Sequence, residues 1–230
     1  MLIYFPSGKK DFPDGNNLEN FNSESQDMNN DINQAVQEIK QGRIIIYPTE
    51  TFFAIGGAGT NPEVVGKVRE IKGRPHQKPL PLIAGSMEQC LEAAQMDGLS
   101  LKIAEQFWPG PLSLLVRAKG IIPFGVKDSE NMVSIRVTPH QDAAKLCHLS
   151  GSPLIATSAN FSGKPPCARY IDLDKQLIQK VGFVFGSDVL PAGDLPSTLV
   201  RITGPGQVKI IRPGKVSIEE IMQKGWEIKS

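Results

Sequence analysis

The sequence has 230 residues, 40% of them hydrophobic, and can therefore bury a sizeable core as one large α/β domain. The formal net charge is +1, but residues 1–31 hold six acidic and two basic side chains, which leaves 23 basic against 18 acidic residues, or +5, in the remainder. This modest excess favours anionic partners, whereas three widely spaced cysteines and three histidines argue against structural zinc, and the lack of eighteen successive apolar residues argues against a membrane span.

The N-terminal stretch, residues 1–30, is predicted to be a poorly ordered extension, because it is rich in polar residues and poor in aliphatic ones. It lacks the apolar stretch of a secretory signal, and it is acidic where an organelle transit peptide would be rich in arginine. We therefore expect a cytoplasmic protein. Residues 31–230 are expected to form one folded domain, which begins with an amphipathic helix at residues 31–41.

The first expected strand, residues 43–47, is rich in isoleucine and stops at a proline. It is followed by Thr49, Glu50 and Thr51, in a loop that continues through a glycine-rich stretch to residue 59. In open α/β sheets, ligands bind at such strand ends. The sequence therefore predicts that this loop contributes to a binding site.

A helix is predicted at residues 62–72, where apolar residues recur at three-to-four spacing. Gly73 ends this helix, and the proline after Arg74 favours an extended backbone there. Lys72 and Arg74 can then point the same way, as alternate residues of a strand do. Taken alone, the two cations fit a ligand site no better than the alternative in which Lys72 complements the helix dipole and Arg74 is a solvated loop charge.

A second strand end carries small polar residues. The apolar run at residues 153–156 predicts a central strand that leads into Thr157, Ser158 and Asn160. Serine and asparagine also satisfy the backbone in ordinary turns, so this segment alone is ambiguous. Three such segments together indicate one pocket for a phosphorylated ligand. The chain has no Walker motif and no GxGxxG, so ATP would be held without a P-loop.

The remaining periodicity predicts loosely alternating strands and helices. Strands are expected near 80–84, 112–117, 133–137, 153–157, 181–185, 198–202 and 207–211. Helices are expected at 86–95, 99–107, 140–149 and 217–224, with a further candidate before 181. The late strands follow one another closely, which favours an α/β fold with a mixed, twisted sheet over a purely parallel one.

Six short segments occur in a fixed order along residues 31–222: PTET at 48–51, KxR at 72–74, WPGPLS at 108–113, SIRV at 134–137, TSAN at 157–160 and RPG at 212–214. In this order they resemble the TsaC/YrdC family of threonylcarbamoyl-AMP synthases, in its short, single-domain form. The resemblance implies a twisted open α/β sheet with flanking helices and a concave cleft.

The same resemblance implies a nucleotidyltransferase that joins L-threonine, bicarbonate and ATP into threonylcarbamoyl-AMP and releases pyrophosphate. No catalytic side chain is expected, because the carbamate of the substrate is itself the nucleophile. Mg²⁺ is expected on the phosphates of ATP and not on protein side chains. A downstream threonylcarbamoyl transferase would use the product to modify tRNA, and tRNA or RNA is a further candidate partner.

The resemblance also assigns site residues in two sets, each carried over from a matching motif. Threonine or its carbamate would be held by Thr49, Arg136, Thr157 and Ser197. ATP would be contacted by Lys72, Arg74, Ser113, Ser158, Asn160 and Arg212. Arg136 suits a carboxylate because a guanidinium offers paired donors.

Three positions depart from the pattern of many family members. Phe53 and Ala54 replace a Tyr-Gly pair, and Ile83 replaces a histidine, which leaves the contacts to threonine open. Two other hypotheses stay in play. One is a non-catalytic RNA- or nucleotide-binding member of the same superfamily. The other is a carbamoyl-transfer domain of the hydrogenase-maturation type, which occurs within a much longer chain.

Overall fold

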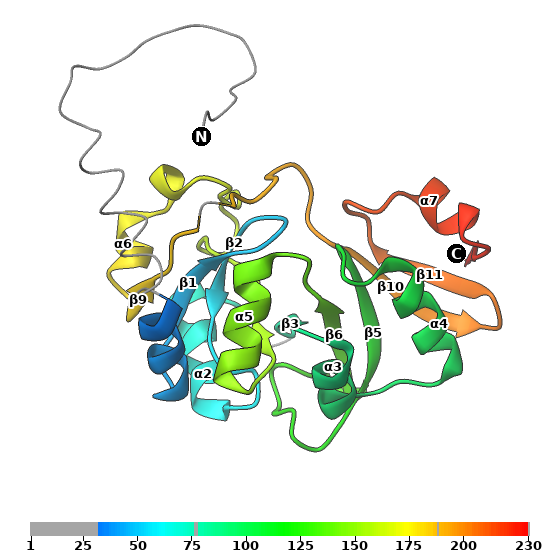
Figure 1. Cartoon of the computed structure of the whole chain (residues 1–230), viewed down its shortest axis with the longest axis horizontal. Helices are drawn as coiled ribbons and strands as arrows, with labels where there is room; N and C mark the ends of the chain where they lie inside the picture. Colours follow the sequence, from blue (N-terminus) through cyan, green and yellow to red (C-terminus); the bar gives the residue numbers. More distant parts are fainter. Residues whose placement is uncertain (1–31, 76–77, 188, 230) are drawn as a thin grey trace, which may run out of the picture.

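The structure is a computed structural model that describes residues 32–75, 78–187 and 189–229. The predicted N-terminal extension, residues 1–30, lies outside these residues. Two open sheets of mixed strand direction are flanked by helices (Figure 1). The predicted α/β class with open mixed pairing is confirmed, but the strands are divided between two sheets.

The smaller sheet is built around a hairpin from the N-terminal half of the domain. In hydrogen-bonding order its strands are β8 (Thr157–Ser158), β2 (Phe53–Gly56), β1 (Ile45–Pro48) and β9 (Phe183–Val184). β1 and β2 pair antiparallel, so the PTET loop is the turn of this hairpin. β9 joins β1 in parallel, and β8 joins β2 antiparallel.

The larger sheet holds most strands of the C-terminal half and occupies the right-hand part of Figure 1. In order its strands are β12 (Glu227–Lys229), β11 (Gln207–Arg212), β10 (Thr198–Gly204), β5 (Leu112–Ala118), β6 (Met132–Val137), β3 (Leu82–Ala84) and β7 (Leu154–Ile155). β4 (Ala94–Gln95) pairs with β5 beside this path. β9 and β10 belong to different sheets (Figure 1).

The helices begin and end where the sequence supplies caps. The Asn61 side chain accepts the amides of Glu63 and Val64 at the start of α2, and Gly73 ends that helix with φ 60°. The set comprises a helix at 32–40, α2 (Pro62–Lys72), α3 (Met87–Ala93), α4 (Gly98–Phe107), α5 (Gln141–Ser150), α6 (Lys175–Ile178) and α7 (Ile218–Gln223), with a 3-10 turn, η1 (Tyr170–Asp172). None of the helices in the described part of the chain has the length and apolar character needed to cross a membrane.

The two sheets meet where β7 passes into β8. Ile155 belongs to the larger sheet and Thr157 to the smaller, and the Ile155 amide donates to the Gly57 carbonyl at 3.0 Å. A Cβ on Gly56 would lie 1.8 Å from the Ile155 carbonyl oxygen, so only glycine allows this approach. The Tyr47 hydroxyl of β1 donates to the same carbonyl at 2.7 Å and so holds the junction of the two sheets together.

Three predictions of local structure are wrong. Residues 53–56 form β2 and not a loop, because the hairpin pairs them with β1. Residues 94–95 leave the predicted helix and pair with Ala118 and Arg117 of β5. The predicted strand at 153–157 is split between the sheets, since β7 and β8 pair with different neighbours. β12 was not predicted at all.

Candidate active site

A cavity of about 390 Å³ opens between the two sheets and is here called the main cavity. The PTET turn, β2 and β8 line it from the smaller sheet, while β6, the end of β11 and the segment before β10 line it from the larger. Seven residues predicted from the sequence share it: Thr49, Arg74, Arg136, Thr157, Ser158, Ser197 and Arg212. Segments far apart in the sequence thus contribute to one site.

A side cavity of about 240 Å³ adjoins the main cavity, because Arg74 and Ser158 line both. It is formed by the loop after α2 and the loop after β8, and Lys72 and Asn160 lie in its wall. The predicted convergence of Lys72 and Arg74 is therefore seen in the structure. Of the ten predicted site residues, only Ser113 lines neither cavity.

Three guanidinium groups meet at the main cavity. Burial lowers the pKa of Arg212, and the charges of Arg136 and Arg74 lower it further. Burial likewise lowers the pKa of Arg74. Mutual repulsion of this kind raises the free energy of the empty site, and at an effective dielectric of ~20 two unit charges ~4 Å apart interact by about 4 kcal/mol. An anionic ligand would relieve that repulsion, so the arrangement favours phosphates and carboxylates.

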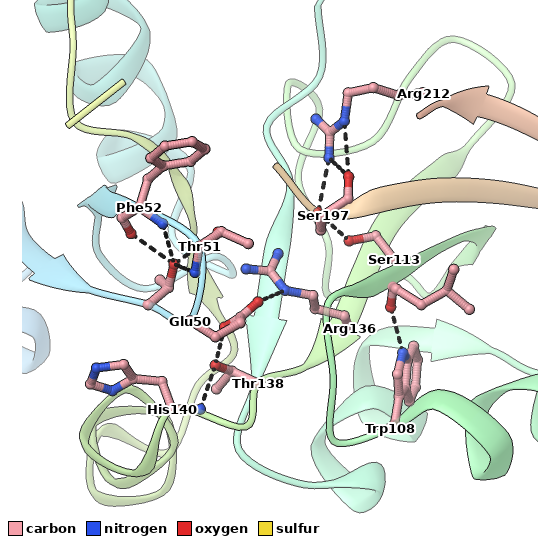
Figure 2. A network of polar contacts seen from close by, with 12 residues as sticks. Glu50, Thr51, Phe52, Trp108, Ser113, Arg136, Thr138, His140, Ser197 and Arg212 are labelled. Carbon is pink, nitrogen blue, oxygen red and sulfur yellow. Dashed lines mark hydrogen bonds and ion pairs between the residues drawn. The ribbon is translucent and has the colours of Figure 1, made fainter. Parts of the chain in front are cut away.

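Arg136 is held from behind by an acidic residue. Its Nε donates to Glu50 at 2.7 Å, and the other carboxylate oxygen accepts the Thr138 hydroxyl at 2.7 Å (Figure 2). Burial alone would raise the pKa of Glu50, but the Arg136 charge and the hydrogen bond from Thr138 hold it below its ordinary value. The carboxylate is therefore ionised at neutral pH.

Lys72 closes the base of the TSAN loop. It is 3% exposed, and its ammonium donates to the backbone carbonyls of Ser158 and Asn160. Burial, together with the nearby charge of Arg74, lowers the pKa of Lys72 to about 7. Among the described residues no carboxylate forms an ion pair with Lys72, which agrees with its lowered pKa; an anionic ligand placed beside it would favour the charged form.

Ser113 lies behind the cavity wall. It is fully buried and its hydroxyl is 3.0 Å from that of Ser197. Arg212 in turn donates to the Ser197 carbonyl at 2.7 Å and to its hydroxyl at 2.9 Å (Figure 2). Ser113 thus supports Ser197, and its direct contact with ATP stays a prediction.

The PTET turn is stabilised by its own threonines. The Thr49 hydroxyl donates to the Phe52 carbonyl at 2.7 Å and lies 3.2 Å from the Thr51 hydroxyl. Phe53 and Ala54, which depart from the family pattern, line the main cavity. Ile83 lies outside both cavities, fully buried in the apolar cluster under α5.

Sequence reasoning missed several residues of the site, among them Thr138 and Asp194. Thr138 follows Arg136 by two positions, one residue beyond the end of β6, and this alternate spacing in an extended segment is a signal that the sequence contained. Asp194 lines the main cavity and forms an ion pair with Lys215. It lies in the segment before β10, where no periodicity or motif indicated its position.

Asn160 is expected to contribute to nucleotide binding through its side chain. The amide nitrogen donates to the carbonyls of Phe161 and Lys164, whereas the buried oxygen Oδ1 has no partner among the described residues. Asn160→Ala should raise KM for ATP by about tenfold, the effect of ~1.4 kcal/mol, and leave KM for L-threonine, the expected amino-acid substrate, near its original value. Equal changes in both constants, in a variant shown to be folded by circular dichroism, would contradict a contact specific to ATP.

Comparison with known proteins identifies the family. The family model Sua5_yciO_yrdC, described as telomere recombination, matches residues 37–214. The chain belongs to the Sua5/YciO/YrdC family. The predicted membership is confirmed, and the matched residues include every predicted site residue and every strand of the two sheets except β12.

Among curated relatives, the threonylcarbamoyl-AMP synthase of Vibrio parahaemolyticus serotype O3:K6 is 36% identical over 151 residues, 64% of this chain and 82% of that protein. The threonylcarbamoyl-AMP synthase of Pyrococcus abyssi is 31% identical over 192 residues, 83% of this chain and 56% of that protein. This family member thus spans little more than half of the archaeal relative.

Solved structures confirm the fold. P. abyssi Sua5 complexed with L-threonine superposes with a TM-score of 0.78 and 30% identity, over 86% of this chain and 58% of that one. Escherichia coli YciO superposes with a TM-score of 0.73 over 83% of this chain and 92% of that one, but at 19% identity it informs the fold alone.

Proposed function

We propose that this protein is a threonylcarbamoyl-AMP synthase, an enzyme that forms threonylcarbamoyl-AMP and pyrophosphate from L-threonine, bicarbonate and ATP. The observation that carries the proposal is the convergence of Arg74, Arg136, Arg212 and Lys72 on two joined cavities. It is supported by relatives of that name at 31–36% identity and by the threonine complex of the similar archaeal structure. The assignment to the nucleotidyltransferases follows from the proposed reaction.

The chemistry requires anions to be brought together. The amine of threonine and bicarbonate first form N-carboxythreonine with the loss of water. A carbamate oxygen of N-carboxythreonine then attacks the α-phosphorus of ATP, forming a P–O bond while the bond from the α-phosphorus to the bridging oxygen breaks and pyrophosphate leaves. The main work of the protein is to offset repulsion and to align the reacting atoms. No side chain needs to act as the nucleophile, since the carbamate supplies the attacking oxygen.

The two joined cavities suggest how the substrates are arranged. In the proposed complex Thr49, Arg136, Thr157 and Ser197 hold threonine or its carbamate in the main cavity. The phosphates of ATP extend from Arg212 past Arg74 and Ser158 to Lys72 and Asn160. The shared wall formed by Arg74 and Ser158 then lies next to the reacting phosphorus.

Mg²⁺ is proposed to arrive with ATP. Among the described residues, no group of three or more His, Cys, Asp or Glu side chains could hold a metal ion. The phosphate oxygens are hard ligands that suit Mg²⁺, and the ion would neutralise part of the triphosphate charge. The cations of the chain would act on the remaining negative charge.

A cytoplasmic location, a downstream threonylcarbamoyl transferase and contact with tRNA or RNA remain predictions. They follow from the proposed product, which would be consumed in tRNA modification. The alternative of a non-catalytic nucleotide-binding protein makes a different prediction, namely ATP binding without turnover.

The proposed reaction is tested by measuring pyrophosphate release with ATP, Mg²⁺, bicarbonate and L-threonine, and omitting one substrate at a time. We expect release only in the complete mixture, together with a product whose mass equals threonylcarbamoyl-AMP. Release without threonine would indicate another acceptor. ATP binding without any release would favour the non-catalytic alternative.

A further inference from the structure

A buried carboxylate lies directly behind the cationic wall of the main cavity. The side chains of Arg136 and Glu50 are only 4% and 12% exposed, and their ion pair joins β6 of the larger sheet to the PTET turn of the smaller one. Thr138, two residues along from Arg136, donates to the second carboxylate oxygen. Its own hydroxyl oxygen accepts the His140 amide at 3.2 Å. The carboxylate is thus fixed from two directions.

This contact uses only the Nε atom of the Arg136 guanidinium. Glu50 engages Nε alone, and within the described residues no hydrogen bond reaches the two terminal nitrogens of Arg136. Figure 2 shows these nitrogens pointing away from the strand, into the space between the turn at Phe52 and the Arg212–Ser197 pair. Two parallel N–H groups in that position match the two oxygens of a carboxylate.

We propose that Glu50 is a positioning residue which, itself held by Thr138, orients Arg136 so that its terminal nitrogens bind the carboxylate of the amino-acid substrate. The inference rests on the proposed function and deepens it. Without the Glu50 charge, Nε keeps at most a neutral acceptor and the ion pair is lost, so the long side chain regains rotamers in which the terminal nitrogens no longer point into the cavity. Thr138 acts indirectly, because its hydrogen bond holds the Glu50 carboxylate that in turn orients Arg136.

A purely structural role for the ion pair predicts something else. In that case the pair joins the two sheets, and its loss lowers stability and weakens every ligand of the site to a similar degree. A positioning role weakens the amino acid selectively, because ATP is assigned to Arg74, Arg212 and the side cavity. The ratio of the two affinities therefore separates the alternatives.

The experiment compares the dissociation constants of L-threonine and ATP, measured by isothermal titration calorimetry on folded protein. Glu50→Gln should weaken threonine about tenfold, which corresponds to ~1.4 kcal/mol, and change ATP less than twofold. Glu130→Gln is the matched control, since it neutralises the carboxylate of an exposed pair with Arg201. That control should leave both constants at their original values.

Variants of Thr138 test the second link. Thr138→Val should weaken threonine about threefold, whereas Thr138→Ser keeps the hydroxyl and should restore the affinity. The double variant Glu50→Gln with Thr138→Val should bind threonine no more weakly than Glu50→Gln alone, because Thr138 acts through Glu50. If Glu50→Gln does not fold, the two single variants of Thr138 still test the proposal.

Several results would overturn the assignment. Unchanged threonine affinity in folded Glu50→Gln or in Thr138→Val would remove it, as would equal weakening of threonine and ATP. If the unaltered protein releases pyrophosphate and Glu50→Gln binds threonine equally well, the role of Glu50 is refuted while the proposed function stands. An unaltered protein that neither binds threonine nor releases pyrophosphate refutes the proposed function itself.

Discussion

Replacing Arg74 by alanine is expected to reduce kcat/KM for threonine-dependent pyrophosphate release by about 10²–10³-fold, a loss of ~3–4 kcal/mol of transition-state stabilisation. Arg74 lies in the wall shared by the two cavities, and its terminal nitrogens reach the Thr157 hydroxyl at 3.4 Å and the Pro79 carbonyl at 2.8 Å. It is therefore the cation best placed to act on charge that develops between the two substrates.

The effect should fall on catalysis more than on folding. Arg74 is partly exposed, and its hydrogen bonds go mainly to the adjacent loop. Arg117→Ala is a suitable control, because that arginine is exposed on β5 and lines neither cavity. Thermal unfolding should place both variants within a few degrees of the unaltered protein. Full activity in folded Arg74→Ala would show that the assignment of this residue is wrong.

The sequence predicted those parts of the site that depend on local chemistry. Gly73 ends α2 in the left-handed conformation, as expected, and so places Lys72 and Arg74 along one wall. The TSAN segment also lies at a strand end, since β8 stops at Ser158. Both features follow from the residues nearest in sequence, and such features survive without knowledge of the tertiary fold.

The errors have a tertiary cause. Residues 53–56 contain Gly56 and follow a turn, so they read as loop, yet pairing with β1 and β8 makes them a central strand. The same holds for the division into two sheets, which depends on the close approach of Gly56 to Ile155. No local periodicity encodes a contact between residues that lie about a hundred positions apart in the chain.

The role of Glu50 shows a third limit. The sequence identified it as part of a polar loop, and Arg136 as a carboxylate-binding candidate, but it gave no reason to connect the two. The connection arises because β1 and β6 lie in different sheets whose ends face each other across the main cavity. A contact between side chains carried by two different sheets can decide how a site works, and only the folded structure shows it.

Binding of ATP is expected to be accompanied by the uptake of close to one proton at pH 8, and Lys72 is the group that gains it. With its pKa at about 7, Lys72 is mostly neutral at this pH in the free protein. A triphosphate placed beside it would favour the ammonium and raise the pKa again. Calorimetry in buffers of different ionisation enthalpy measures the uptake, which should shrink at pH 6, where Lys72 already carries the proton.

The same titration fixes how stability depends on pH. Because the pKa falls from 10.5 to about 7 on folding, the unfolded chain binds the extra proton between these values, and the free energy of unfolding rises with pH across that window. Below pH 7 the penalty for burying the charged ammonium is present in full. In Lys72→Met this part of the pH dependence and the proton uptake should both vanish.

Lys72→Met should also lower kcat/KM about 100-fold, or ~2.7 kcal/mol, because the carbonyls of Ser158 and Asn160 lose their shared donor and the TSAN loop is no longer held in place. Lys67→Met is the matched control, since Lys67 is exposed on the same helix and lines neither cavity. It should retain both the activity and the proton uptake. If Lys72→Met still took up a proton with ATP at pH 8, the titrating group would be another one, and the cation in the side cavity would be charged before the nucleotide arrives.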